Sequence, residues 1–133
     1  MTWPRFNKKD TGPSTKAVGD AAENAALAHL QAAGLRLMAR NFRTPGRGGG
    51  EIDLIMRERD GTLVFVEVRQ RADASRGGAS ASITPRKQQR IVLAARHFLL
   101  RLGSQPPCRF DAVLIEGARI EWLRAAFDAT VAF

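Results

Sequence analysis

The sequence predicts an α/β domain in which a mixed β-sheet is flanked by α-helices. Three observations predict this fold. Strong helix formers fill residues 20–33, DAAENAALAHLQAA. Two segments with strand character, EIDLIMR at 51–57 and LVFVEVR at 63–69, follow a glycine-rich loop. A second helical stretch and two further strands come after them, so helices and strands alternate along the chain.

The ends of the first helix and the loop that follows have clear sequence signals. Gly34 stands where a C-terminal cap belongs, and residues 35–38 are a candidate short strand. Residues 44–50, TPGRGGG, predict a loop because four glycines and a proline disfavour regular structure. The chain before the helix lacks periodicity, so we expect a flexible basic N-terminal tail over 1–15 and one domain over 16–133.

A second helix is predicted near the middle of the chain. Thr84 is placed as its N-cap and Pro85 as its first residue, a position where the missing N–H of proline costs nothing. After the second strand we expect an exposed loop over 70–83, this helix over 84–102, and two strands over 110–115 and 119–123.

The charge of the chain predicts its kind of partner. Its 21 basic and 13 acidic residues give a net charge of +8 and a pI of about 11.2. Such an excess favours a polyanion, DNA or RNA, because Lys and Arg release counterions from a phosphate backbone. The alternative is an arginine-rich surface that only aids solubility.

Other composition features exclude several classes of protein. No window approaches the roughly 20 apolar residues of a membrane helix, and the basic N-terminus has no apolar segment of a signal peptide. We therefore expect a cytoplasmic protein with no membrane association. The single cysteine, Cys108, excludes an internal disulfide and a cysteine zinc site.

Two acidic residues on neighbouring strands are the leading site candidates. Residues two apart on a strand share a face, so Glu51 lies with Asp53, and Glu67 lies with Arg69. The register depends on the turn between the strands. A two-residue Asp60-Gly61 turn puts Asp53 and Glu67 on opposite faces, whereas a three-residue loop over 59–61, with its glycine left-handed, pairs them. We expect the three-residue loop.

Glu67 interrupts the apolar run VFVEVR, which predicts a strand covered on both faces. A buried carboxylate needs a cation or a metal ion beside it. The alternative is a salt bridge to Arg57, Arg69 or Arg71.

Glu23 is a candidate third acid, because it lies on the apolar stripe of the first helix. Alternatively it only stabilises the start of its own helix. Three oxygen donors of this kind suit Mg²⁺ or Mn²⁺, which can activate a water for attack on a phosphodiester.

Basic residues near these acids are candidate phosphate contacts. Three of them fill the first turn of the second helix, where they oppose the helix dipole, and others lie in or beside loops. The alternative is a solvated basic face. The candidate nucleic-acid-binding residues are Arg43, Arg47, Arg71, Arg86, Lys87 and Arg90.

Six short motifs occur in a fixed order from residue 16 to the end: Gly19–Glu23, Arg40–Arg43, Gly50–Ile55, Phe65–Arg71, Lys87–Arg90 and Arg109–Asp111. Together they resemble the YraN family, an uncharacterised bacterial group related in fold to archaeal Holliday junction resolvases and other PD-(D/E)xK nucleases. The resemblance implies a restriction-endonuclease-like fold and a Mg²⁺ or Mn²⁺ cofactor. It also implies Asp53 and Glu67 as catalytic metal ligands, with Glu23 as an accessory acid and ligand. Analogy with the wider fold favours a homodimer.

One position departs from the family pattern. The motif lysine is replaced by Arg69, which stays charged and cannot exchange a proton. Arg69 could still clamp a phosphate or pair with Glu51 or Glu67. Lys87 is a substitute if its helix end faces the site.

The leading hypothesis is therefore a metal-dependent, endonuclease-like protein acting on DNA. The first alternative is a catalytically inactive nucleic-acid-binding module of the same fold, favoured by the missing motif lysine. The second is a structural or interaction protein whose acids are all in salt bridges.

Overall fold

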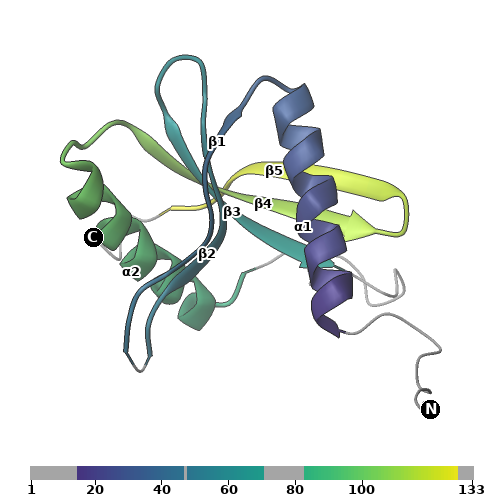
Figure 1. Ribbon diagram of the computed structural model, residues 1–133, viewed down its shortest axis with the longest axis horizontal. Helices are drawn as coiled ribbons and strands as arrows, with labels where there is room; N and C mark the ends of the chain where they lie inside the picture. The colour runs from purple at the N-terminus through teal and green to yellow at the C-terminus, as the bar shows by residue number, and fades with distance from the viewer. Residues whose placement is uncertain (1–14, 47, 71–82, 129–133) are drawn as a thin grey trace, which may run out of the picture.

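The computed structural model describes residues 15–46, 48–70 and 83–128 (Figure 1). Its elements are α1 Thr15–Ala32, β1 Arg36–Arg43, β2 Glu51–Arg57, β3 Leu63–Gln70, α2 Pro85–Leu102, β4 Cys108–Glu116 and β5 Arg119–Phe127. The predicted α/β fold with a mixed sheet and flanking helices, as in the restriction-endonuclease-like class, is confirmed. The predicted tail over 1–15 and loop over 70–83 fall almost wholly outside the described residues. None of the described helices combines the length and apolarity needed to span a membrane.

The sheet has the strand order β1-β2-β3-β4-β5, with β3 and β4 parallel and the other neighbours antiparallel. Helix α2 connects the parallel pair, as a crossover connection requires. Figure 1 shows α1 on one face of the sheet and α2 on the other. Each helix closes its own buried apolar cluster, so the domain has three layers with the sheet in the middle.

Two core clusters occupy the two faces. The α1 core includes Ala26, Leu30, Leu54, Met56, Val64, Val66 and Val113. The α2 core includes Ile52, Ile55, Phe65, Ile91, Ala94, Ala95, Phe110 and Ala112. The strands β2, β3 and β4 contribute to both cores, which explains the near-continuous apolar run of β3.

Several elements are longer than predicted. Helix α1 begins five residues before the predicted start at Asp20, and Lys16 Nζ lies 2.9 Å from the carboxylate of Asp20 one turn later. Strand β1 continues to Arg43 and β5 to Phe127. Both are edge strands with a register shift and a left-handed residue, Asn41 in β1 and Ala125 in β5, so polar and apolar residues do not alternate regularly along them.

The predicted start of α2 is confirmed. Thr84 has an extended backbone, and its hydroxyl accepts a hydrogen bond from the backbone N–H of Lys87 at 3.2 Å. Pro85 is the first helical residue, and Gly103 ends the helix in a left-handed conformation. This cap fixes the backbone of Lys87 in the first turn of α2.

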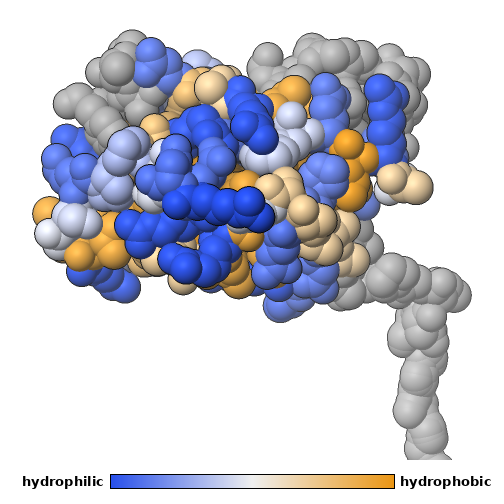
Figure 2. Space-filling model, turned by 90° about the horizontal axis from the view of Figure 1, so that it is seen from above, coloured by the Kyte–Doolittle hydropathy of each residue, from blue (hydrophilic) through white to orange (hydrophobic). Residues whose placement is uncertain are grey.

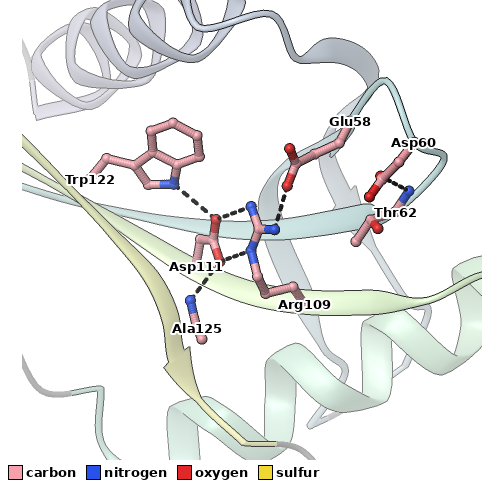
Figure 3. A network of polar contacts seen from close by, with 7 residues as sticks. All are labelled: Glu58, Asp60, Thr62, Arg109, Asp111, Trp122 and Ala125. Atoms are coloured by element: carbon pink, nitrogen blue, oxygen red, sulfur yellow. Dashed lines mark hydrogen bonds and ion pairs between the residues drawn. The ribbon is translucent and has the colours of Figure 1, made fainter.

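A buried polar network ties β4 to β5 and to the β2–β3 turn (Figure 3). The fully buried carboxylate of Asp111 accepts four hydrogen bonds of 2.9–3.0 Å, two from Arg109 and one each from Trp122 Nε1 and Ala125 N. Arg109 also pairs with Glu58 on the turn. The Arg109-Phe110-Asp111 motif therefore has a structural role in this fold.

Candidate functional site

The β2–β3 turn has the three-residue form that brings the two acids together. Residues 59–61 form the loop, the Glu58 N–H donates to Thr62 O at 2.9 Å, and Gly61 has a φ of +95°. The backbone pairs run from Arg57 opposite Leu63 to Leu54 opposite Val66. The next residues in this register are Asp53 and Glu67, so the predicted pairing of these strands is confirmed.

Asp53 lies where the backbone ladder between β2 and β3 ends. Its carboxylate takes the place of a backbone acceptor, because Oδ2 accepts the N–H of Val68 at 2.8 Å. The sequence predicts that Ile52 and Leu54 share a face, but Ile52 packs in the α2 core and Leu54 in the α1 core. The alternation of β2 is therefore interrupted at Asp53, and its side chain is directed toward β3.

Glu67 is the buried member of the pair, with only 9% of its side chain exposed. Its Oε2 lies 3.4 Å from Lys87 Nζ, whereas Oε1 is buried and has no hydrogen-bond partner among the described residues. Burial and the neighbouring charge of Asp53 raise the pKa of Glu67 to about 7, while Lys87 opposes that rise. Burial likewise raises the pKa of Asp53, against the hydrogen bond from Val68. While the pair carries a single negative charge, one proton can lie between the two carboxyl groups. Once both groups are ionised, no such proton remains and the two charges repel each other.

Gly50 explains how α2 reaches this pair. A β-carbon at Gly50 would lie 2.1 Å from the carbonyl oxygen of Arg90 and 2.7 Å from the backbone nitrogen of Ala94. Only glycine lets the start of β2 approach the helix backbone this closely. Sequence reasoning placed Gly50 at the end of a glycine-rich loop and missed this contact, although its place beside a strand was a usable signal.

Arg90, one turn after Lys87, binds a different acid. Its Nη2 lies 3.2 Å from Glu51 Oε1, and its Nε donates to Gly49 O at 3.1 Å. The sequence left open a salt bridge between Glu51 and Arg69. In the structure Glu51 forms a salt bridge with Arg90. Arg69 is half-buried on β3, two residues beyond Glu67 and opposite Leu114 of β4.

Glu23 does not join the two strand acids. Its Oε1 lies 3.4 Å from Arg40 Nε, and its side chain is 15% exposed. Within the described ranges, no three residues of the His, Cys, Asp and Glu types form a group that could hold a metal ion. The structure therefore assembles two of the three predicted acidic ligands and leaves the third in an ion pair.

The donor set still fits Mg²⁺ or Mn²⁺. These ions bind through one or two carboxylates and keep several waters. Oε1 of Glu67 has no hydrogen-bond partner among the described residues, and burial is the largest cause of the raised pKa of both acids, so the ionised pair would be stabilised by additional positive charge. A divalent cation would supply that charge, with Asp53 and Glu67 as its protein ligands.

The predicted phosphate contacts lie partly beside this pair. An open hollow of about 480 Å³ is lined by Gly48, Arg86, Gln89, Arg90 and Leu93. Arg43 is exposed at the end of β1, where its backbone pairs with Glu51. Arg47 and Arg71 lie outside the described residues.

Helix α2 and the edge strand β1 form a strongly basic part of the surface. Their segments contain eight Lys or Arg residues and no acid: Arg36, Arg40, Arg43, Arg86, Lys87, Arg90, Arg96 and Arg101. The two elements are in contact, because Phe98 packs edge-on to Phe42 and the Arg101 guanidinium lies 5.3 Å above the Phe42 ring.

Figure 2 looks onto the end of the molecule that carries the β2–β3 turn. Hydrophilic residues occupy the middle of this view. A hollow of about 360 Å³ there is lined by Gly34, Arg36, Arg57, Glu58, Arg59 and Gly61.

The chain is closely similar to several bacterial proteins over most of its length. Residues 22–115 match the profile described as "Uncharacterised protein family UPF0102", which confirms the resemblance to the YraN family. A "UPF0102 protein" of Paracidovorax citrulli (strain AAC00-1) is 67% identical over 131 residues, 93% of this chain and 97% of the relative. A "UPF0102 protein" of Acidovorax sp. (strain JS42) is 69% identical over 125 residues, 94% and 95% of the two chains.

Among solved structures, "Crystal structure of SSO0001" aligns with a TM-score of 0.43 and 14% identity. The alignment covers 90% of this chain, which spans 57% of the length of that one.

Proposed function

This chain belongs to the UPF0102 family, and we propose that it binds DNA and hydrolyses phosphodiester bonds with a divalent metal ion held by Asp53 and Glu67. The observation that carries this proposal is the meeting of two acids from adjacent strands, one of them buried with an unpartnered oxygen. The proposal deepens the family assignment, which by itself states no activity.

A purely structural role explains the pair poorly. Bringing two carboxylates together in a partly buried position raises the energy of the charged state. When both are ionised, above about pH 7, Lys87 offsets only one of the two negative charges. A salt bridge made for stability alone needs one acid and one base. The second acid is explained when a cation of higher charge binds between the strands.

Each residue of the site has a distinct role in the proposed reaction. A bound Mg²⁺ or Mn²⁺ would polarise the phosphate and lower the pKa of a coordinated water. Asp53 and Glu67 would hold that ion, and the Val68 N–H keeps the Asp53 carboxylate oriented toward it. Lys87 is the group that can hold or exchange a proton, because Arg69 remains charged. The fixed planar fork of Arg69 suits a phosphate contact.

The basic surface of α2 and β1 supports a polyanionic substrate. Its two segments contain eight cationic residues and no acid, and three of these, Arg40, Lys87 and Arg90, are paired with acids of other elements. The surface begins at the turn of α2 that carries Lys87. A phosphate backbone along this surface would gain binding energy from counterion release and lead directly to the acid pair. The hollow lined by Arg86 and Arg90 would hold a phosphate in this arrangement.

Cleavage assays test the proposal. Branched, nicked and single-stranded DNA are incubated with the full chain and Mg²⁺ or Mn²⁺, and the Asp53→Asn and Glu67→Gln variants are compared with Glu121→Gln. Glu121 is an exposed acid on β5, so its variant controls for the loss of one negative charge. We expect metal-dependent products from the wild type and the control only. Equal cleavage by all four proteins would refute the assignment of the site.

A second candidate function is a catalytically inactive nucleic-acid-binding module, favoured by Arg69 at the position of the motif lysine. Here the wild type binds DNA but leaves it intact, and Arg69→Lys creates metal-dependent cleavage. Activity in the wild type at a rate that Arg69→Lys does not raise would exclude this alternative.

A further inference from the structure

We propose that the ammonium group of Lys87 takes the place of a divalent cation in the metal-free site, and that a bound divalent ion displaces it toward the ligand surface. The inference rests on the proposed function only in assigning a cation to Asp53 and Glu67. It adds a coupling between metal binding and phosphate binding that the proposed function does not contain.

The first argument is the position of the ammonium group. Lys87 Nζ lies 3.4 Å from Glu67 Oε2, and its charge also acts on Asp53. Its positive charge therefore stabilises the ionised form of both acids. The cap made by Thr84 holds the backbone of Lys87, so displacement of the ammonium needs only rotation of its side chain.

The second argument is the charge balance within the site. Above about pH 7, where both carboxyl groups are ionised, the two carboxylates and one ammonium leave a single negative charge, which the charge of a divalent ion exceeds. A divalent ion and an ammonium at the same pair of acids would repel each other at short range, where solvent screens little. The two cations therefore compete for the pair.

The third argument is that Lys87 is free to leave, whereas its basic neighbour is not. The side chain of Lys87 is 33% exposed and has a flexible four-carbon stem. Arg90 is bound to both Glu51 and the Gly49 carbonyl, so it does not replace Lys87 at the pair. Once displaced, the flexible side chain of Lys87 would extend into solvent beside the first turn of α2.

The coupling has a direct consequence. A divalent ion that releases Lys87 adds one cation to the phosphate-binding surface. By linkage, a phosphate ligand that holds Lys87 away from the acids strengthens metal binding by the same factor.

Calorimetric titration of the full chain with Mn²⁺ tests the competition. We compare the wild type with Lys87→Met, with Lys16→Met as a control that also removes one lysine charge, and with Asp53→Asn. Removal of the competing ammonium should tighten Mn²⁺ binding about tenfold in Lys87→Met, the typical size of a coupling between charged sites. Lys16→Met should change the affinity about twofold or less, because its exposed ammonium pairs with Asp20 and not with the two acids.

The outcomes separate this inference from the proposed function. Unchanged or weaker Mn²⁺ binding by Lys87→Met, with normal binding by the wild type, overturns the competition and leaves the metal site standing. Absence of binding in every protein overturns both. Loss of binding in Asp53→Asn alone supports the site.

A measurement on the wild-type chain does not depend on the folding of a variant. Acylation of lysines by acetic anhydride is followed by mass spectrometry with and without Mn²⁺. Lys87 should react faster when Mn²⁺ is bound, whereas Lys16, an exposed lysine paired with Asp20, should not change. Slower acylation of Lys87 with Mn²⁺ would mean that the ammonium stays in the site, contrary to the proposal.

Discussion

Gly50 and Arg90 are in backbone contact: a β-carbon at Gly50 would lie 2.1 Å from the carbonyl oxygen of Arg90. This contact sets the distance between α2 and the start of β2. It therefore determines whether the first turn of α2, with Lys87, can reach an acid on β3. The glycine of the Gly-Glu-Ile-Asp-Leu motif is required by packing between two elements, not by flexibility in a loop.

Substitution of this glycine should damage both stability and site. Gly50→Ala forces α2 away from β2, and overpacking of this kind costs about 1–3 kcal/mol or more. Urea denaturation measures the loss. Gly19→Ala is the matched control, because a β-carbon there meets nothing within 4 Å and the residue lies inside α1. That variant should gain about 0.5–1 kcal/mol from helix propensity. Equal stability of the two variants would contradict the packing role of Gly50.

The acid pair should make the metal-free protein less stable at higher pH. Burial and then the charge of Asp53 raise the pKa of Glu67 to about 7, above its ordinary value of 4.5. The folded state therefore holds a proton that the unfolded state releases. The stabilisation is complete below pH 4.5 and is lost as pH rises through about 7. Burial raises the pKa of Asp53 in the same direction.

This pH effect is measurable by urea denaturation in EDTA at pH 5 and pH 8. Its size is at most on the order of 3 kcal/mol, from 1.36 kcal/mol for each unit of pKa. Glu67→Gln should flatten the pH profile, since glutamine does not titrate. Excess Mn²⁺ should stabilise the wild type most at the higher pH, where both acids are ionised. A wild-type profile as flat as that of Glu67→Gln would count against the buried pair.

The sequence left two turns open for the central hairpin, and we expected the three-residue loop because only that loop brings the two acids together. The structure has that loop, with Gly61 left-handed at its end. Once the loop length is known, it fixes which residues of β2 and β3 face each other. The start of α2, by contrast, was predicted from local chemistry alone, through Thr84 and Pro85.

Long-range contacts were less accessible to sequence reasoning. Lys87 was only a conditional substitute for the motif lysine, because its approach depends on the packing of α2 against Gly50. Glu23 lies on an apolar stripe of α1 as expected. However, α1 covers the face of the sheet opposite α2, and Glu23 pairs there with Arg40. Spacing within one helix does not report which face of a sheet that helix will cover.

The network around Asp111 should be a major source of stability. Asp111→Ala leaves Arg109 without its buried partner and also removes acceptors from Trp122 and Ala125. Loss of one member of a buried ion pair costs about 3–5 kcal/mol. Trp122→Phe removes only one hydrogen bond and the indole ring's extra contacts, so it should cost less than Asp111→Ala. Urea denaturation compares the two. Similar losses would mean that packing of Trp122, rather than the carboxylate, dominates.

The basic surface of α2 should give DNA binding a steep dependence on salt. If Arg86 contacts a phosphate, Arg86→Ala should weaken binding to every DNA sequence alike. It should also reduce the slope of log K against log salt by about one, as expected for one lost phosphate contact. Arg119→Ala is the matched control, since Arg119 is exposed at the β4–β5 turn and pairs in register with Glu116, away from α2. Fluorescence anisotropy with a labelled duplex at several salt concentrations gives both slopes. An equal change of slope in the two variants would show that DNA responds to total charge, so that the α2 surface has no special part in binding.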